Sequence, residues 1–273
     1  MPKSYATTIK ALRITMTADP VIWDRAQYME SQLATLTAAD LERFERDDRS
    51  TWRQLPGDLK AAKRDPIQGR ILTRRVSGVL DDLLGRAAWP VPRDWGRPIV
   101  TFPEPGDWEV PTRHWHWDNP CELHLEQPRA LFVVSFIGPV APRGGGTLIL
   151  SGSPRLLIEQ ERRKPAGQPT VYGAPLWERL HRCDPWLMAL TGLTPSPSDR
   201  TAAFMETESI VQGVPLRVVE LTGEPGDMVF CHPLMVHCAA PNRGARPRFM
   251  RIKQQFLTHE SRDLLSRLER PPS

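Results

Sequence analysis

The sequence has few cysteines and no long apolar run. Its four cysteines form no Cys-x-x-Cys pair and no regular framework among 273 residues; they are Cys121, Cys183, Cys231 and Cys238. A chain of this length with that pattern is not a disulfide-stapled domain, and free thiols in a reducing compartment are expected. The opening segment, 1–20, lacks the continuous apolar stretch of a secretion signal, and nowhere do about 18 apolar residues follow one another as in a membrane span. We therefore expect a cytoplasmic protein without a membrane partner.

The sequence also has no large excess of charge of either sign. With 36 basic and 32 acidic residues the net charge is only +4, and the basic residues form no long run and no groove studded with aromatics. A nucleic-acid partner is therefore not expected. The three glycines at 144–146 are followed by no Lys-Ser/Thr pair, which argues against a phosphate-binding loop and favours a turn before a strand.

Proline, by contrast, is abundant, with 28 residues. Because proline ends helices and is excluded from central strands, the chain must turn often. The pattern before residue 95 is mainly helical: amphipathic periods run through 19–36, 36–48 (with Thr37 as N-cap) and 70–85, which Gly85 closes.

Short β-rich runs bounded by proline or glycine dominate the rest of the chain. They are 99–103, 130–137, 146–152, 215–222, 227–231 and 248–257, with helical insertions at 154–164 and 174–192. No composition break marks a linker. We predict one α+β domain over 1–273: a helical region over 1–95, and an antiparallel sandwich or barrel over 96–260 with a helical insertion at 154–195.

The segment "RHWHWDNP" contains three possible metal ligands, His114, His116 and Asp118, which alternate with Trp115 and Trp117. In an extended strand, residues two apart share a face. The three polar side chains would then point one way and the tryptophans would pack into the sandwich. The pattern alone leaves open which two of the three would bind a metal.

A second segment, 223–250, supplies further candidates. His232 and His237 follow a turn and a short strand, and the cluster "RGARPR" ends on Arg248. Two histidines and one carboxylate on one face of an octahedral metal leave three positions open, as in non-haem Fe(II) oxygenases. A guanidinium nearby would bind the far carboxylate of a bidentate 2-oxo acid. We interpret His232, which precedes a proline, as structural.

These two segments together resemble the phytanoyl-CoA dioxygenase family of Fe(II)/2-oxoglutarate oxygenases. The likeness consists of His-x-Asp at 116–118, "GDMVFCHPLMVH" ending on His237, Asn242, and Arg248 eleven residues after that histidine. The stretch 143–157 is similar to the family's Gly-Gly-Thr…Pro-Gly-Ser-His segment, and the likeness runs in order through most of 36–257.

The resemblance implies a double-stranded β-helix (jelly-roll, cupin-like) core, and Fe(II), 2-oxoglutarate and O2 as cofactors and co-substrate. It implies that His116, Asp118 and His237 hold the iron and that Arg248 holds the oxoglutarate C5 carboxylate. The expected activity is hydroxylation or another oxidation of a small-molecule substrate, with release of succinate and CO2. We expect His114 to contact the substrate or to form a hydrogen bond next to the metal ligands.

Two positions depart from the family pattern. Ala239 stands where the family often has a serine that contacts oxoglutarate, and Pro154 replaces the histidine of the Gly-Ser-His motif. The carboxylate at Asp118 is retained, which disfavours halogenation, because related halogenases have a small residue there.

Three other functions compete. A cupin-type metalloprotein would use His114, His116, Glu122 and His237, with Asn242 nearby and Arg248 idle. A non-catalytic jelly-roll binding module would need none of these ligands. Nucleic-acid demethylation by the same iron chemistry is permitted by a pI near 9.0. The sequence, however, shows no basic, aromatic-studded groove of the kind that binds such substrates.

Overall fold

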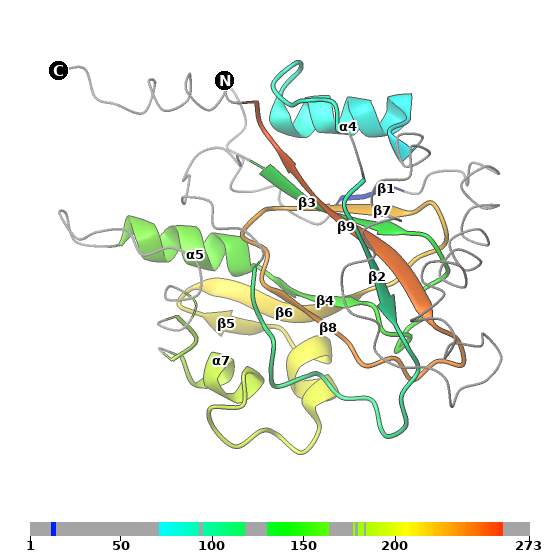
Figure 1. Cartoon of the computed structure of the whole chain (residues 1–273). Helices are drawn as coiled ribbons and strands as arrows, with labels where there is room; N and C mark the ends of the chain where they lie inside the picture. Colours follow the sequence, from blue (N-terminus) through cyan, green and yellow to red (C-terminus); the bar gives the residue numbers. More distant parts are fainter. Residues whose placement is uncertain are drawn as a thin grey trace, which may run out of the picture.

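The computed structural model of the chain describes residues 12–14, 71–92, 95–117, 130–163, 177, 180–182 and 184–258. Its core consists of two antiparallel sheets (Figure 1). The five-stranded sheet has the order β1-β7-β3-β9-β2, with β1 Leu12–Ile14, β7 Met228–Cys231, β3 Ala130–Phe136, β9 Arg248–Phe256 and β2 Arg97–Thr101. The four-stranded sheet has the order β5-β6-β4-β8, with β5 Ser209–Val211, β6 Val214–Leu221, β4 Thr147–Ser151 and β8 His237–Ala239.

Every β-rich run named from the sequence coincides with one of the longer strands, and the predicted antiparallel arrangement is confirmed. The three-residue strands β1, β5 and β8 were not predicted, because so short a run carries no period. The glycines at 144–146 form the expected turn before β4.

The space between the two sheets is filled by alternate residues of facing strands. Phe132, Val134 and Phe136 of β3 pack against Ile149 of β4 and Leu221 of β6 in one apolar cluster. Strand residues two apart share a face, so the odd-numbered neighbours of this β3 set point to the opposite side. Because both faces of β3 are covered, all of its residues are buried.

Helix α4 (Arg74–Leu84) covers the outer face of the five-stranded sheet, above it in Figure 1. It begins where the Thr73 hydroxyl accepts a hydrogen bond from the backbone N–H of Val76 at 3.3 Å. It ends at Gly85, whose φ of 97° an L side chain would resist. Its buried residues, Val76 and Leu80, pack against the outward-facing residues of β3 and β7. The predicted helix and its glycine stop are confirmed.

The outer face of the four-stranded sheet is covered by the insertion between β4 and β5. Helix α5 (Ser153–Arg162), helix α7 (Pro185–Leu190) and the π-helix η4 (Ala202–Glu206) contribute buried residues to a second apolar cluster there. The single helix expected over 174–192 is interrupted: Asp184 caps α7 by accepting from the N–H of Trp186 at 2.8 Å, and Pro185 opens it. Proline at the first helical position starts a helix and cannot continue one.

The helices expected at 19–36 and 36–48 lie outside the described residues, and the single-domain organisation stays a prediction. Among the described residues, no helix is long and apolar enough to cross a membrane.

Candidate metal and anion site

His116 and His237 lie directly opposite each other at one edge of the four-stranded sheet. The His116 N–H donates to the His237 carbonyl at 3.0 Å, and the His237 N–H donates to the His116 carbonyl at 2.7 Å. Directly paired residues on antiparallel segments project their side chains from the same face. The centroids of the two imidazole rings are accordingly 4.6 Å apart.

Backbone carbonyls fix the tautomer of both rings. The His116 Nδ1 lies 2.6 Å from the His114 carbonyl oxygen, and the His237 Nδ1 lies 2.9 Å from that of Met235. A carbonyl only accepts, so the Nδ1 atoms carry the hydrogens and in each neutral ring the lone pair is on Nε2. Histidines that ligate metals are oriented in this way, with one ring nitrogen donating to a carbonyl and the other left to the metal. The two rings therefore fit a metal.

The two histidines differ in their surroundings. His237 is 4% exposed, and its ring stacks on that of Phe132, with centroids 4.4 Å apart and planes 21° from parallel. His116 is exposed. Phe132 belongs to the five-stranded sheet, so His237 packs against the core between the two sheets, whereas His116 lies at the surface.

His114 does not lie in an extended run, contrary to the sequence prediction. Its φ is 67°, in the left-handed region that non-glycine residues rarely adopt. The two-residue alternation therefore breaks at His114, and its carbonyl rather than its ring is what touches His116. The exposed His114 ring cannot be assigned to the metal face by alternation.

Trp115 and Trp117 are buried, as predicted, at 5% and 9% exposure. They belong to the apolar cluster on the outer face of the four-stranded sheet, with residues of α5 and α7. The Trp115 indole N–H donates to the Pro111 carbonyl at 2.8 Å. The buried Arg200 donates to the same carbonyl at 3.2 Å and to that of Val110 at 2.7 Å. The segment leading into His116 is thus anchored to the helical insertion.

Asp118 and Glu122, the carboxylates of the two competing ligand sets, lie outside the described residues. Within the part of the chain that the structure describes, no group of three His, Cys, Asp or Glu side chains is gathered as a metal cluster.

Arg248 is not a surface residue of a basic loop, since it is only 3% exposed. Its Nε donates to the Gly145 carbonyl at 2.6 Å and one Nη donates to the Thr101 hydroxyl at 2.5 Å. The other terminal nitrogen, Nη1, is buried and has no hydrogen-bond partner among the described residues. Burial lowers the pKa of this guanidinium to about 10, a shift that the Glu220 carboxylate opposes, so the group stays charged at neutral pH. A buried cationic donor without an acceptor suits a ligand carboxylate.

The strand pattern puts Arg248 on the inner face of the five-stranded sheet. Met250, two residues on, packs between the sheets in the same cluster as Phe132, and residues two apart share a face. Phe132 in turn stacks on His237. The buried cation and the histidine pair thus belong to the same interior.

Asn242 is a structural residue rather than a ligand. Its amide nitrogen donates to the carbonyls of Thr101 and Arg246, each at 2.9 Å, and its amide oxygen accepts from the Gly244 N–H at 2.9 Å. Both amide hydrogens and the amide oxygen of Asn242 are therefore engaged by the end of β2 and by the loop between β8 and β9.

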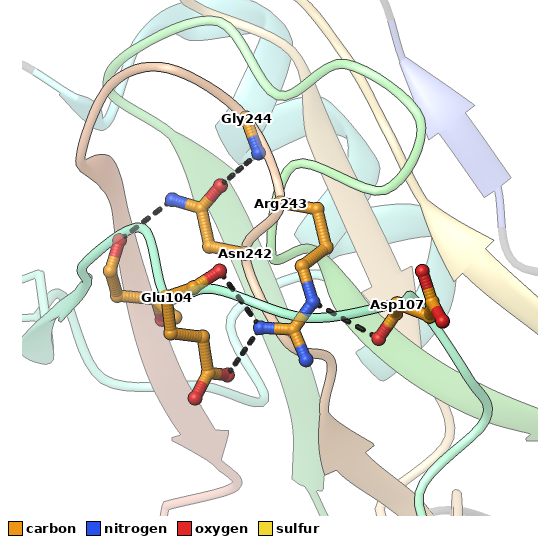
Figure 2. A network of polar contacts seen from close by, with 6 residues as sticks. Glu104, Asp107, Asn242, Arg243 and Gly244 are labelled. Carbon is orange, nitrogen blue, oxygen red and sulfur yellow. Dashed lines mark hydrogen bonds and ion pairs between the residues drawn. The ribbon is translucent and has the colours of Figure 1, made fainter.

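Arg243, beside Asn242, holds the segment that follows β2. Figure 2 shows its guanidinium between Glu104 and Asp107: it donates to their carbonyls at 2.9 and 3.0 Å and lies 3.5 Å from the Glu104 carboxylate. The loop after β8 and the segment after β2 are in this way tied together beside Arg248.

His232 is structural, as predicted. It is 5% exposed, its Nδ1 accepts from the Leu234 N–H at 3.1 Å, and burial lowers its pKa to about 4. Cys231 and Cys238 are free and buried, and burial raises the pKa of both thiols.

The sequence prediction missed the residues that surround Arg248: Thr101, Gly145 and Glu220. Thr101 pairs with Arg248 across β2 and β9, and Glu220 accepts from backbone N–H groups of the turn that contains Gly145. Only the strand register brings them together, and no single-sequence signal carries that register.

No family model matches the chain, and no curated protein matches it. Among solved structures, the chain is similar to HygX from Streptomyces hygroscopicus with nickel and 2-oxoglutarate bound, at 15% identity over 92% of this chain and 84% of that one, with a TM-score of 0.49. It is also similar to AviO1 from Streptomyces viridochromogenes, at 13% identity over 91% and 90% of the two chains, with a TM-score of 0.47. EctD from S. alaskensis follows at 16% identity over 92% and 74%, with a TM-score of 0.46. At this degree of likeness, function has to be argued from the chain's own residues.

Proposed function

We propose that the protein is an Fe(II)- and 2-oxoglutarate-dependent oxygenase of the phytanoyl-CoA dioxygenase type, with its two sheets forming a double-stranded β-helix. His116, Asp118 and His237 would hold the iron, and Arg248 would hold the distal carboxylate of 2-oxoglutarate. The substrate would be a small molecule.

The observation that carries this proposal is the pairing of His116 and His237. Their backbones exchange two hydrogen bonds, and both Nδ1 atoms donate to carbonyls. A histidine whose only task is to fill a core needs no such matched partner, whereas a metal needs Nε2 lone pairs projected from the same face. Asp118 follows His116 by two residues, the spacing that the resemblance requires.

When bound, iron would activate O2 as the oxidant, and oxidative decarboxylation of 2-oxoglutarate to succinate and CO2 would supply two of the electrons that reduce it. The protein's own groups do the remaining work. Arg248 neutralises an anion that would otherwise be costly to bury. Phe132 covers one side of His237 and keeps water from it, and the carbonyls of His114 and Met235 hold both rings in the ligating tautomer.

The proposal is tested by anaerobic titration of metal-free protein with Fe(II) and 2-oxoglutarate, following the weak visible charge-transfer band of the chelate. We expect the band in wild type and His114→Ala, its loss in Asp118→Ala, and its weakening in Arg248→Ala. Iron binding without any band in wild type would refute the oxygenase assignment. Iron lost from His114→Ala but kept by Asp118→Ala would favour the cupin-type ligand set instead.

A substrate screen by succinate release would follow. Absence of oxoglutarate turnover with every compound, alongside a normal band, would point to the non-catalytic binding module.

A further inference from the structure

We propose that Glu220, on β6, is a positioning residue that orients Arg248 for the distal carboxylate of the oxo acid without pairing with it. The inference rests on the proposed function for the identity of that anion. Neither the metal motif nor the Arg248 spacing contains Glu220, and hydrogen bonds connect Glu220 with Arg248 through the turn between β3 and β4.

The half-buried Glu220 carboxylate holds this turn at two points. One oxygen accepts from the Arg143 N–H at 2.8 Å, and the other accepts from the Gly146 N–H at 3.4 Å. The turn needs such a hold, because Arg143 has a φ of 62°, an unfavourable conformation for a non-glycine residue. It also lies tight against β6: a Cβ added to Gly146 would be 2.5 Å from the Leu221 carbonyl oxygen.

Between these two points lies Gly145, whose carbonyl accepts from the Arg248 Nε at 2.6 Å. A Cβ at Gly145 would be 2.7 Å from that of Asn242, so the peptide is also fixed from its other side. Together with the Thr101 hydroxyl, the Gly145 carbonyl sets the plane of the guanidinium. That plane decides where Nη1 points, the donor that has no partner within the described part of the chain.

The charge of Glu220 also acts on Arg248 through space. Burial raises the pKa of Glu220. The hydrogen bonds from the backbone N–H groups of Arg143 and Gly146, and the charges of Arg143 and Arg248, oppose this rise. The Glu220 charge in turn opposes the lowering of the Arg248 pKa. Among the described residues these two make no direct ion pair, because both carboxylate oxygens are turned to the loop. The carboxylate thus balances the buried cation and leaves Nη1 to a ligand.

The test compares two ligands in Glu220→Gln, a change that removes the charge and one acceptor but keeps the shape. Metal-free protein is loaded anaerobically with Fe(II), and dissociation constants are measured for 2-oxoglutarate and for 2-oxopentanoate, which has the same chain length but no distal carboxylate. We expect binding of 2-oxoglutarate to weaken by about tenfold, as for one charge-assisted hydrogen bond. Binding of 2-oxopentanoate and of Fe(II) itself should not change. Glu224→Gln, at an exposed glutamate just after β6, is the matched control.

A second pair of variants separates positioning from mere loop stability. In an Arg248→Met background, Glu220→Gln should have no further effect on 2-oxoglutarate, because Glu220 acts through Arg248. Equal weakening of both ligands by Glu220→Gln, or an additive effect in the double variant, would overturn the inference while the proposed function stands. If wild type and Arg248→Met bind 2-oxoglutarate alike, the anion assignment of Arg248 fails, and this inference with it.

Discussion

The buried His232 makes the protein's stability depend on pH in a way that can be calculated. Its ring is 5% exposed and burial lowers its pKa from 6.5 to about 4. In the unfolded chain the same ring would titrate near its ordinary value. Between these two pKa values the unfolded state binds more protons than the folded state, so stability falls as pH falls from above 6.5 to below 4.

The size of the effect follows from the same pKa values. At pH 7 both states are mostly neutral, and the contribution is only about 0.2 kcal/mol. At pH 5 the unfolded ring is almost fully protonated and the folded ring is not, which costs about 2 kcal/mol. His232→Asn removes this titration and can keep an acceptor for the Leu234 N–H.

The measurement is urea-induced unfolding of the metal-free protein at pH 7 and pH 5, with chelator present. We expect the loss of stability between the two pH values to be smaller by roughly 2 kcal/mol in His232→Asn than in wild type. An identical pH dependence in wild type and His232→Asn would refute the reasoning.

Three further predictions concern the scaffold. Ser135→Ala should lower the free energy of unfolding by about 1–3 kcal/mol, because the buried Trp95 indole N–H loses its acceptor at 2.8 Å; Ser135→Thr, which keeps the hydroxyl, should lose less. Gln212→Asn should raise it by about 0.5 kcal/mol, because Gln212 has a φ of 51° at the first position of the two-residue turn that it forms with Gly213, where asparagine is favoured; an unchanged urea midpoint would contradict this. Leu80→Ala should cost about 2–5 kcal/mol, since Leu80 is 0% exposed on α4, and a cost well under 1 kcal/mol would mean that α4 is not packed on the sheet.

The longer elements were predictable because their signals are local. The apolar runs over 130–137 and 248–257 have strand-forming residues on both faces, and proline or glycine marks the neighbouring turns. Helix α4 shows a 3.6-residue period and a glycine stop. The two motifs predicted that His116 and His237 lie close together, and the two residues are paired in the structure.

Other features depend on pairing and could not be read from one sequence. The left-handed φ of His114 is only weakly signalled by its residue type, and it breaks the alternation of the run that begins there. The burial of Arg248 depends on its register opposite Thr101. Which face of the sheet receives Trp115 and Trp117 was also undetermined, because both faces of the four-stranded sheet are apolar.

The backbone pairing of His116 with His237 also bears on how the protein matures. The two residues are 237 − 116 = 121 positions apart, so their contact is among the late, non-local ones that slow the folding of β proteins. A nascent chain that has not yet emerged beyond β8 cannot form the pair. Metal capture by these rings would therefore follow closure of the sheet, and would draw the folding equilibrium toward the closed chain by mass action.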